Sequence, residues 1–362
     1  MYDILIVGAG ITGITLAQKY AELGKKILLI DKRNHIGGNC YDFLNQKGHL
    51  IHPYGPHIFH TNNEKVWQYI SKFTKWNNYK HTVKSFIRGK LYPFPININT
   101  INKLFDKNYD EVTIKKFFDT KKTHIKNPTN AKDVILNQVG EQLYKLFFEK
   151  YTTKQWGMSP EKLSPEITGR IKIKLNKNNF YFTDKYQGLP LESYTSLFKK
   201  MLDNKYITIM LNTNFNSLST NIKYNNVIFT GPIDSFFNNK YGKLPYRSLK
   251  FEIKSYEFNK FQKTATINYP GNEKYTRITE FKHMTLQNVN GTTTLTEFPS
   301  SQGPEFYPIL TTKSKKLFKQ YMIEANKIKN VYFLGRLGSF SYINMDKAVE
   351  LALRFVNIQK LQ

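Results

Sequence analysis

A glycine-rich turn between two short apolar runs constrains this chain more than any other feature. The first apolar run, 4–7, leads into the turn, and the second, 27–30, ends on Asp31. The turn carries three glycines, Gly8, Gly10 and Gly13. They allow a tight turn, a close approach of the backbone to a pyrophosphate, and close packing of helix on strand, in that order. Because Asp31 can accept hydrogen bonds from a ribose, we favour a dinucleotide-binding βαβ unit over an ordinary tight turn.

The charge of the chain invites a nucleic-acid interpretation, which the distribution of that charge does not favour. The formal charge is +27 over 362 residues, but only seven of the 54 basic residues are arginine. The lysines are spread along the chain, which is typical of a solvated surface. We therefore expect no nucleic-acid partner, only a general attraction for anionic ligands.

Cysteine usage and hydropathy both predict a cytoplasmic location. Cys40 is the only cysteine, so neither a disulfide framework nor a cysteine metal cluster is expected. Residue 1 leads directly into the first apolar run, and no apolar run approaches the length of a membrane span. These observations predict a cytoplasmic protein that does not enter a membrane.

A second ligand-facing segment follows the first βαβ unit. Gly38 and Asn39 belong to a paired-glycine turn, which suggests another close approach of the backbone to phosphate or flavin. His57 and His60 are three residues apart among apolar and aromatic residues. A metal pair lacks a third ligand nearby, so we favour histidines packed in the core or against a flat cofactor ring.

The rest of the chain predicts insertions into one α/β domain. Residues 99–150 are mainly helical in pattern, and 248–298 alternate as an antiparallel sheet does. The segment 330–358 reads as strand, glycine-rich turn and helix, and it resembles the start of the chain. No second glycine fingerprint of the first kind follows, so no separate nicotinamide domain is expected.

Arginines and aromatic residues carry the prediction of a second ligand. Arginine binds phosphate in a bidentate manner, and Arg170, Arg247, Arg277 and Arg336 stand out in a chain that otherwise uses lysine. Arg170 lies in a Pro- and Gly-bearing loop that we expect to be mobile. No nucleophile elbow, metal triad or carboxylate pair is present, so a cofactor is expected to carry the chemistry.

Taken in order, these stretches resemble the UDP-galactopyranose mutase family. The matching motifs are VGAGITG, RNHIGGN, YGPHIFHTN, YTTKQWG, NNFYFTDKYQG, TGPID, YRSLKF, YTRI and GRLGSFSY. They cover nearly the whole chain, whose length is similar to that of the compact bacterial members. The KQWG, KYQG and YRSLKF stretches are specific to this family rather than common to flavoproteins.

The resemblance implies an α/β fold with a Rossmann-like FAD-binding domain, an inserted helical-bundle domain and an antiparallel β-sheet domain. The FAD-binding domain would comprise 1–80, 186–240 and 311–362. The helical domain would comprise 97–160, and the sheet domain 81–96, 161–185 and 241–310.

The resemblance also implies the reaction. UDP-galactopyranose and UDP-galactofuranose would interconvert by ring contraction, with no net redox change. The path would run through a covalent intermediate, an iminium between N5 of reduced flavin and the sugar. FAD would be active when reduced, which implies an external reductant such as NAD(P)H or a reductase. A homodimer is expected.

Site residues follow from the matching motifs, residue by residue. The resemblance implies catalytic roles for Arg170, Arg277 and His60. It implies substrate contacts for Phe147, Tyr151, Thr152, Trp156, Tyr181, Phe182, Arg247, Asn268, Tyr307 and Tyr342. It implies FAD contacts for Gly8, Gly10, Gly13, Asp31, Gly38, Asn39, His57, Arg336, Asn344 and Met345, and no metal ligands.

Two departures from the family pattern leave alternatives open. Asn344 stands where bacterial members usually have aspartate, and His81 where many have asparagine near the sugar. A mutase for another UDP-hexose, such as UDP-N-acetylgalactosamine, is therefore one alternative. An amine-oxidase-like flavin oxidoreductase and a non-catalytic UDP-sugar-binding protein are the others.

Overall fold

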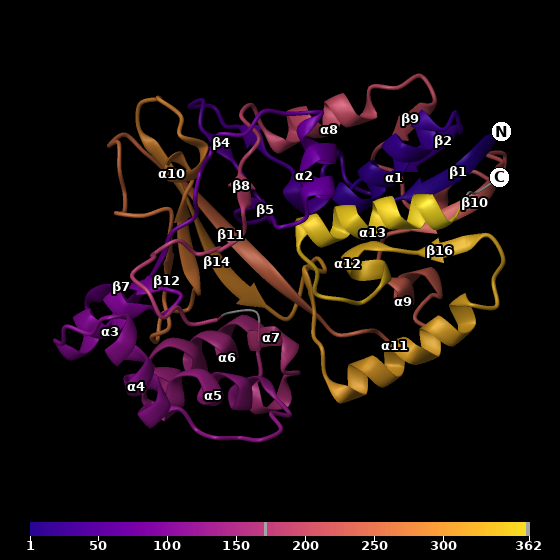
Figure 1. Ribbon diagram of the computed structural model, residues 1–362. Helices are drawn as coiled ribbons and strands as arrows, with labels where there is room; N and C mark the ends of the chain where they lie inside the picture. The colour runs from indigo at the N-terminus through magenta and orange to yellow at the C-terminus, as the bar shows by residue number, and fades with distance from the viewer. Residues whose placement is uncertain (170–171, 360–362) are drawn as a thin grey trace.

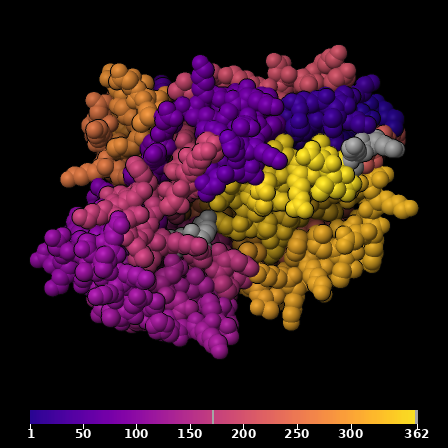
Figure 2. All heavy atoms as spheres, viewed as in Figure 1, coloured from indigo at the N-terminus to yellow at the C-terminus, as the bar shows by residue number. Residues whose placement is uncertain are grey.

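The protein divides into a parallel sheet wrapped by helices, a second and larger sheet, and a helical unit beneath that second sheet (Figure 1). This computed structural model describes residues 1–169 and 172–359. The N- and C-terminal ends lie close together, and the yellow C-terminal helix lies against the indigo N-terminal segment on the face drawn in Figure 2.

The parallel sheet has five strands in the order β16-β10-β1-β2-β9. Their bounds are β1 (Tyr2–Val7), β2 (Ile27–Ile30), β9 (Ile207–Met210), β10 (Tyr224–Phe229) and β16 (Val331–Phe333). The pairings between neighbouring strands of this sheet are all parallel. Parallel sheets are covered on both faces, which is why β1 and β2 are nearly continuous apolar runs.

Alternate residues of β1 enter two different cores. Ile4 and Ile6 pack with the helices on one face, whereas Leu5 and Val7 pack with aromatic side chains on the other. Helices around the sheet are α1 (Ile11–Glu22), α2 (Glu64–Ser71), α8 (Tyr194–Leu202), α9 (Ile233–Phe236), α11 (Thr312–Ala325), α12 (Gly335–Gly338) and α13 (Met345–Ile358). The contact of α1 with α13 returns the C-terminal segment to the first βαβ unit (Figure 1).

The second sheet has seven strands in the order β15-β11-β14-β13-β12-β6-β7. Their bounds are β6 (Val83–Ile87), β7 (Lys90–Phe94), β11 (Tyr246–Tyr256), β12 (Thr266–Asn268), β13 (Arg277–Glu280), β14 (Thr292–Ser300) and β15 (Tyr307–Pro308). The prediction of an antiparallel sheet is wrong for one pair, because β12 runs parallel to β6. These two strands come from distant parts of the chain, so no hairpin sets their relative direction.

The remaining elements are two short two-stranded sheets and several short helical turns. β3 (Phe43–Leu44) pairs with β4 (Leu50–Ile51), and β5 (Phe59–Thr61) pairs with β8 (Tyr186–Gly188). The remaining short elements are α10 (Lys282–Thr285) and the 3₁₀ turns Gly38–Cys40, Pro160–Lys162 and Phe215–Ser217.

A kinked helical unit carries aromatic side chains toward the second sheet. It contains α3 (Ile98–Phe105), α4 (Glu111–Lys121), α5 (Ala131–Leu143), α6 (Lys150–Trp156) and α7 (Glu166–Gly169). Gly140 interrupts α5 at φ +74°, and a Cβ there would lie 1.8 Å from the carbonyl oxygen of Lys121. The close approach of α4 therefore requires glycine. A π-helical stretch, Tyr144–Glu149, then joins α5 to α6.

The helix α2 is shorter than the helical apolar pattern of its sequence. That pattern runs through residues 64–80, but α2 ends at Ser71. The chain then folds back so that Trp76 bridges Pro190 and packs on Trp67. Aromatic packing thus replaces the last helical turns.

No helix in the described part of the chain combines the length and hydropathy that crossing a membrane requires.

Substituting Gly13 should separate α1 from β1. A Cβ on Gly13 would lie 1.9 Å from the carbonyl oxygen of Gly8, a backbone atom that cannot move aside. We expect Gly13→Ala to lower the free energy of unfolding in urea by about 1–3 kcal/mol or more. Gly10→Ala is the matched control, since its nearest atom would be 4.0 Å away. Equal stability of the two variants would contradict this account of the packing.

Candidate active site

Two large cavities meet inside the protein. The cavity around the glycine turn, here the glycine cavity, has a volume of about 740 Å³. The second, here the aromatic cavity, has a volume of about 670 Å³ and lies between the second sheet and the helical unit. Both are lined by His57, Arg336, Asn344 and Met345, which we call the junction. A ligand in one cavity can therefore contact a ligand in the other.

The glycine cavity is built around the uncapped start of α1. Gly10 is the N-cap residue, no side chain caps the helix, and its first turn holds no acidic residue. Free N–H groups at a helix N-terminus bind phosphate. Gly38 stacks on this turn so closely that a Cβ on it would lie 2.9 Å from Cα of Gly10. Two backbone segments without side chains thus form the cavity wall, which fits a pyrophosphate.

Asp31 holds the glycine turn in place. Its carboxylate accepts hydrogen bonds from the N–H of Ala9 at 2.7 Å and from the N–H of Arg33 at 2.9 Å. Both Asp31 and Arg33 line the glycine cavity, and Arg33 donates to the side chain of Asn39 at 2.9 Å. The acid at the end of β2 therefore orders the turn as well as facing the cavity.

Arg336 fixes the junction. Its guanidinium donates to the carbonyl oxygen of Ile343 at 2.7 and 3.2 Å. It also lies 5.5 Å from the ring centre of Tyr307 and 5.3 Å from that of Tyr342. These two rings stack with centroids 5.5 Å apart, and Trp156 packs against both. A permanent positive charge therefore lies beside two stacked tyrosine rings.

Arg277 enters the aromatic cavity from the middle of the second sheet. It directly opposes Asn268 in β12 and Glu297 in β14, so the three side chains share one face of the sheet. Arg277 Nε lies 3.3 Å from Glu297 Oε2. Burial lowers the pKa of Arg277, but Glu297 and nearby tyrosines outweigh this and hold it well above its ordinary value. Arg277 is thus a fixed cation in the cavity wall.

Two histidines, His60 and His81, line the aromatic cavity. His60 Nδ1 is 3.0 Å from Asp184 Oδ2, and its ring stacks on Phe182 with centroids 3.7 Å apart. His81 is buried, with Nδ1 2.9 Å from the hydroxyl of Tyr79. Burial lowers the pKa of His81 to about 3, so this ring is neutral at physiological pH. The pattern of partners gives each ring a fixed orientation.

The structure brings most of the predicted residues to the two cavities. The glycine cavity is lined by Gly8, Gly10, Asp31, Gly38, Asn39, His57, Arg336, Asn344 and Met345. The aromatic cavity is lined by His60, Phe147, Tyr151, Thr152, Trp156, Tyr181, Phe182, Asn268, Arg277, Tyr307 and Tyr342. Gly13 packs on β1 instead. Arg170 lies outside the described residues.

Arg247 is not brought to a cavity wall. Its Nε donates to the carbonyl oxygen of Gln155 at 2.8 Å, and Nη2 to that of Lys154 at 3.0 Å. A cation that binds the last carbonyls of a helix satisfies their hydrogen bonds and its dipole. The structure therefore places Arg247 behind Trp156, at the C-terminal end of α6.

Two acidic side chains were missed by the sequence analysis. Asp184 orients His60, and Glu297 pairs with Arg277. Glu297 occupies a buried position in an alternating strand, and a buried acid nearly always has a partner. That signal was available in TTTLTEF, although the identity of the partner was not.

Known mutases are similar in sequence to this chain over nearly its whole length. The family profile described as UDP-galactopyranose mutase matches residues 146–342, and that of an NAD(P)-binding Rossmann-like domain matches residues 6–73. A probable UDP-galactopyranose mutase from Klebsiella pneumoniae is 36% identical, over 97% of this chain and 93% of that protein. A dTDP-fucopyranose mutase from Escherichia coli is 35% identical, over 98% of this chain and 97% of that protein.

A solved structure has the same fold, and a more distant relative matches part of the sequence. A crystal structure of reduced UDP-galactopyranose mutase superposes with a TM-score of 0.80 at 18% identity, over 99% of this chain and 96% of that chain. A flavin-containing amine oxidase A from Equus caballus is 29% identical over 26% of this chain and 18% of that protein. The relatives of this chain thus include a flavin-containing enzyme, and residues 6–73 match a Rossmann-like dinucleotide-binding domain.

Buried histidines should make the protein less stable in acid. Burial lowers the pKa of His52, His57 and His81 from 6.5 to about 3. Between these values the unfolded chain binds more protons, so the free energy of unfolding decreases as pH falls, by up to about 1.4 kcal/mol per pH unit for each histidine. His81→Gln removes one of these histidines. In urea titrations between about pH 6 and pH 5, we expect the slope of the free energy of unfolding against pH to decrease by the equivalent of roughly one proton.

The matched control is His124→Gln, because His124 is exposed. That variant should keep the slope of the unaltered protein. If His81→Gln also kept it, His81 would be accepting its proton equally in the folded and unfolded states.

Proposed function

This chain belongs to the UDP-galactopyranose mutase family, and from that premise we propose that it binds FAD and interconverts UDP-galactopyranose and UDP-galactofuranose. The observation that carries the proposal is the junction, where a dinucleotide cavity and a cavity with fixed cations share four residues. A reaction between a cofactor and a sugar nucleotide requires such a meeting point.

FAD fits the glycine cavity by the chemistry of its wall. The pyrophosphate would lie on the uncapped N-terminus of α1 beside Gly10 and Gly38, and a ribose would lie near Asp31. His57 and Met345 at the junction would adjoin the flavin end. When bound and reduced, FAD supplies a nucleophilic nitrogen that can displace UDP from the anomeric carbon of a sugar.

The aromatic cavity supplies groups that a UDP-sugar needs. Arg277 and Arg336 are permanent cations in the same cavity wall as Tyr307 and Tyr342, and this set would hold a diphosphate. The wall formed by Phe147, Tyr151, Thr152, Trp156, Tyr181 and Phe182 would take the uridine and sugar. Arg170 is proposed as a further diphosphate ligand on sequence grounds.

Charge stabilisation is the main contribution that these side chains make to the reaction. Departure of UDP leaves negative charge on the diphosphate, and fixed cations stabilise that charge without reorganising. His60 and Asp184 form an oriented pair near Asn268 that would bind sugar hydroxyls. The buried walls exclude water, which would otherwise hydrolyse the activated sugar.

Arg247 is proposed to act on the substrate through Trp156 rather than by contact. It binds the carbonyls at the end of α6 and lies 2.9 Å from the position that a Cβ on Gly157 would occupy.

The partners implied by the resemblance, an external reductant and a second copy of the chain, stay predictions. So does the cytoplasmic location.

The redox state should control turnover. We expect dithionite-reduced, FAD-loaded protein to interconvert the two UDP-sugars and oxidised protein not to, because only the reduced flavin is nucleophilic. Products separated by chromatography measure this. Equal activity in both states would contradict a role for the flavin as nucleophile, and oxygen uptake with an amine would favour an oxidoreductase.

The same assay distinguishes substrates. A panel of UDP-galactopyranose, UDP-N-acetylgalactosamine and dTDP-fucopyranose tests the nucleotide and sugar ends of the cavity. A higher kcat/KM for dTDP-fucopyranose would replace the proposed substrate with that of the Escherichia coli relative. Tight UDP binding without turnover of any sugar would indicate a binding protein.

Loss of the Arg277 charge should reduce the stabilisation of the transition state. A hydrogen bond to a charged group contributes about 1.5–3 kcal/mol, so Arg277→Ala should lower kcat/KM by roughly 10- to 150-fold. Arg277→Lys, which keeps the charge but not the planar fork, should lie between. Arg354→Ala, an exposed arginine on α13, is the control and should match the unaltered protein. Unchanged kcat/KM in Arg277→Ala would refute the assigned role.

A further inference from the structure

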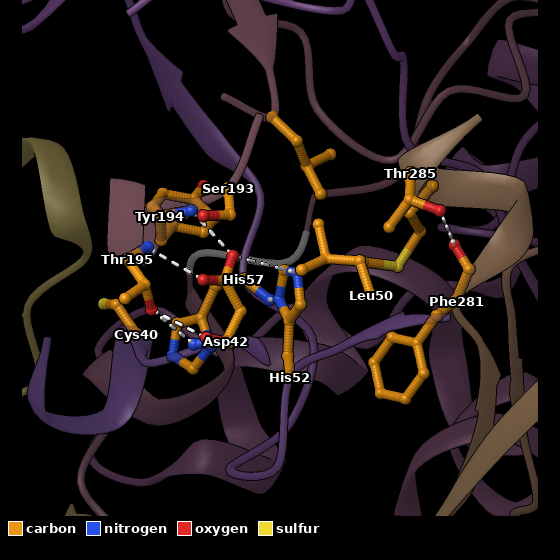
Figure 3. A network of polar contacts seen from close by, with 12 residues as sticks. Cys40, Asp42, Leu50, His52, His57, Ser193, Tyr194, Thr195, Phe281 and Thr285 are labelled. Atoms are coloured by element: carbon orange, nitrogen blue, oxygen red, sulfur yellow. Dashed lines mark hydrogen bonds and ion pairs between the residues drawn. The ribbon is translucent and has the colours of Figure 1, made fainter. Parts of the chain in front are cut away.

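A buried aspartate connects the start of α8 to the loop that carries His57 (Figure 3). Asp42 Oδ2 accepts the N–H of Tyr194 at 2.6 Å, and Oδ1 accepts the N–H of Thr195 at 2.7 Å. The side chain is 1% exposed, and the proposed reaction does not use it. Both of its oxygens are thus held by the first turn of the helix, where a negative charge is favoured.

His52 lies between Asp42 and the His57 loop. Its Nε2 is 3.9 Å from Asp42 Oδ2, beyond hydrogen-bond distance, and it has no other partner in the described chain. Its ring packs against Tyr194 and Phe281, with centroids 5.7 and 5.6 Å away. Figure 3 shows His52 beside Asp42, with Phe281 on the other side of His52. The ring therefore has little freedom to rotate.

The contacts of His52 determine its protonation. The N–H of His57 donates to His52 Nδ1 at 3.2 Å, so Nδ1 carries no proton. The single proton of the neutral ring is then on Nε2, facing the carboxylate of Asp42. A doubly protonated ring would lose the bond to His57. Burial, which lowers the pKa of His52 to about 3, agrees with this assignment.

His52 also closes the loop that precedes His57. Its carbonyl oxygen accepts the N–H of Gly55 at 3.2 Å, while its ring accepts the N–H of His57. This loop places His57 Nδ1 2.8 Å from the carbonyl oxygen of Gly55. A carbonyl only accepts, so Nδ1 of His57 must donate. In the neutral ring Nε2 is then without a proton.

We infer that Asp42 and His52 are positioning residues that fix the His57 loop, so that His57 presents an unprotonated Nε2 at the junction. The His57 ring lines both cavities, and Nε2 has no hydrogen-bond partner in the described chain. The atom is therefore an acceptor for an N–H or O–H donor of a bound ligand. That last step rests on the proposed function, in which the flavin end of FAD adjoins His57.

Asp42 is a positioning residue because its carboxylate faces Nε2 of His52. The carboxylate favours the tautomer of His52 that carries its proton on Nε2, and that tautomer leaves Nδ1 free to accept from His57. Without the carboxylate, the proton could occupy either nitrogen. Asp42 thus acts on His57 only through His52.

The test follows the histidine tautomers by ¹⁵N NMR in the protein without ligand. His57, assigned with a His57→Gln variant, should show a protonated Nδ1 and an unprotonated Nε2. His52→Leu removes the acceptor for the N–H of His57 and should give a mixture of tautomers at His57. His52→Gln offers both an acceptor and a donor and should restore the single tautomer.

His49→Leu is the matched control. His49 is also a buried histidine, 3% exposed, but its ring nitrogens lie near Thr293 and the carbonyl oxygen of Asn290. This variant should leave the signals of His57 unchanged. A protonated Nε2 on His57, or a signal that moves equally in His49→Leu and His52→Leu, would overturn the inference.

Measurements with FAD separate this inference from the proposed function. The Nε2 signal of His57 should move when reduced FAD binds, and His52→Leu should weaken FAD binding by about tenfold and kcat by up to about a hundredfold. If FAD does not bind at all, the proposed function fails and the tautomer result still stands. If FAD binds and turnover is normal in His52→Leu, the positioning role fails.

Discussion

The close packing of α1 on β1 at Gly13 and Gly8 is the contact on which both cavities depend. It brings the N-terminus of α1 to the carboxyl end of the parallel sheet, where ligands bind in open α/β sheets. Asp31 then holds the turn through Ala9, and Gly38 stacks on Gly10. On its outer side, α1 packs against α13, whose first residue, Met345, lies at the junction. A local backbone approach thus positions residues more than 300 positions apart.

Features set by neighbouring residues were predictable, and features set by distant partners were not. The βαβ unit follows from apolar runs and glycines within 31 residues, and the motifs of the family identified most of the cavity walls. The parallel pairing of β6 with β12 joins segments about 180 residues apart, so no local pattern reveals it. The same holds for the approach of α4 to Gly140, which depends on how two helices pack.

The arginines show that residue type alone does not predict which group a side chain contacts. All four selected arginines are suited to phosphate, yet the structure gives three of them different partners. Arg277 faces a carboxylate on the next strand, Arg336 binds the carbonyl of Ile343, and Arg247 binds carbonyls at the end of α6. The partner of Arg247 is 92 residues away in sequence. A guanidinium beside helix carbonyls is a structural group, whatever its suitability for phosphate.

The charge of the junction favours diphosphates and leaves the sugar to neutral groups. Asn344 has no carboxylate, and it begins α13 without capping it through its side chain. His57 and His81 are neutral because burial lowers the pKa of each to about 3. Among the residues that the structure describes, Arg336 therefore forms no ion pair, and the only ion pair of Arg277 is with Glu297 on the neighbouring strand. In the proposed complex these cations would bind the anionic end of the ligand, whereas His81, Asn268 and His60, which line the same cavity, would discriminate among sugars by hydrogen bonds.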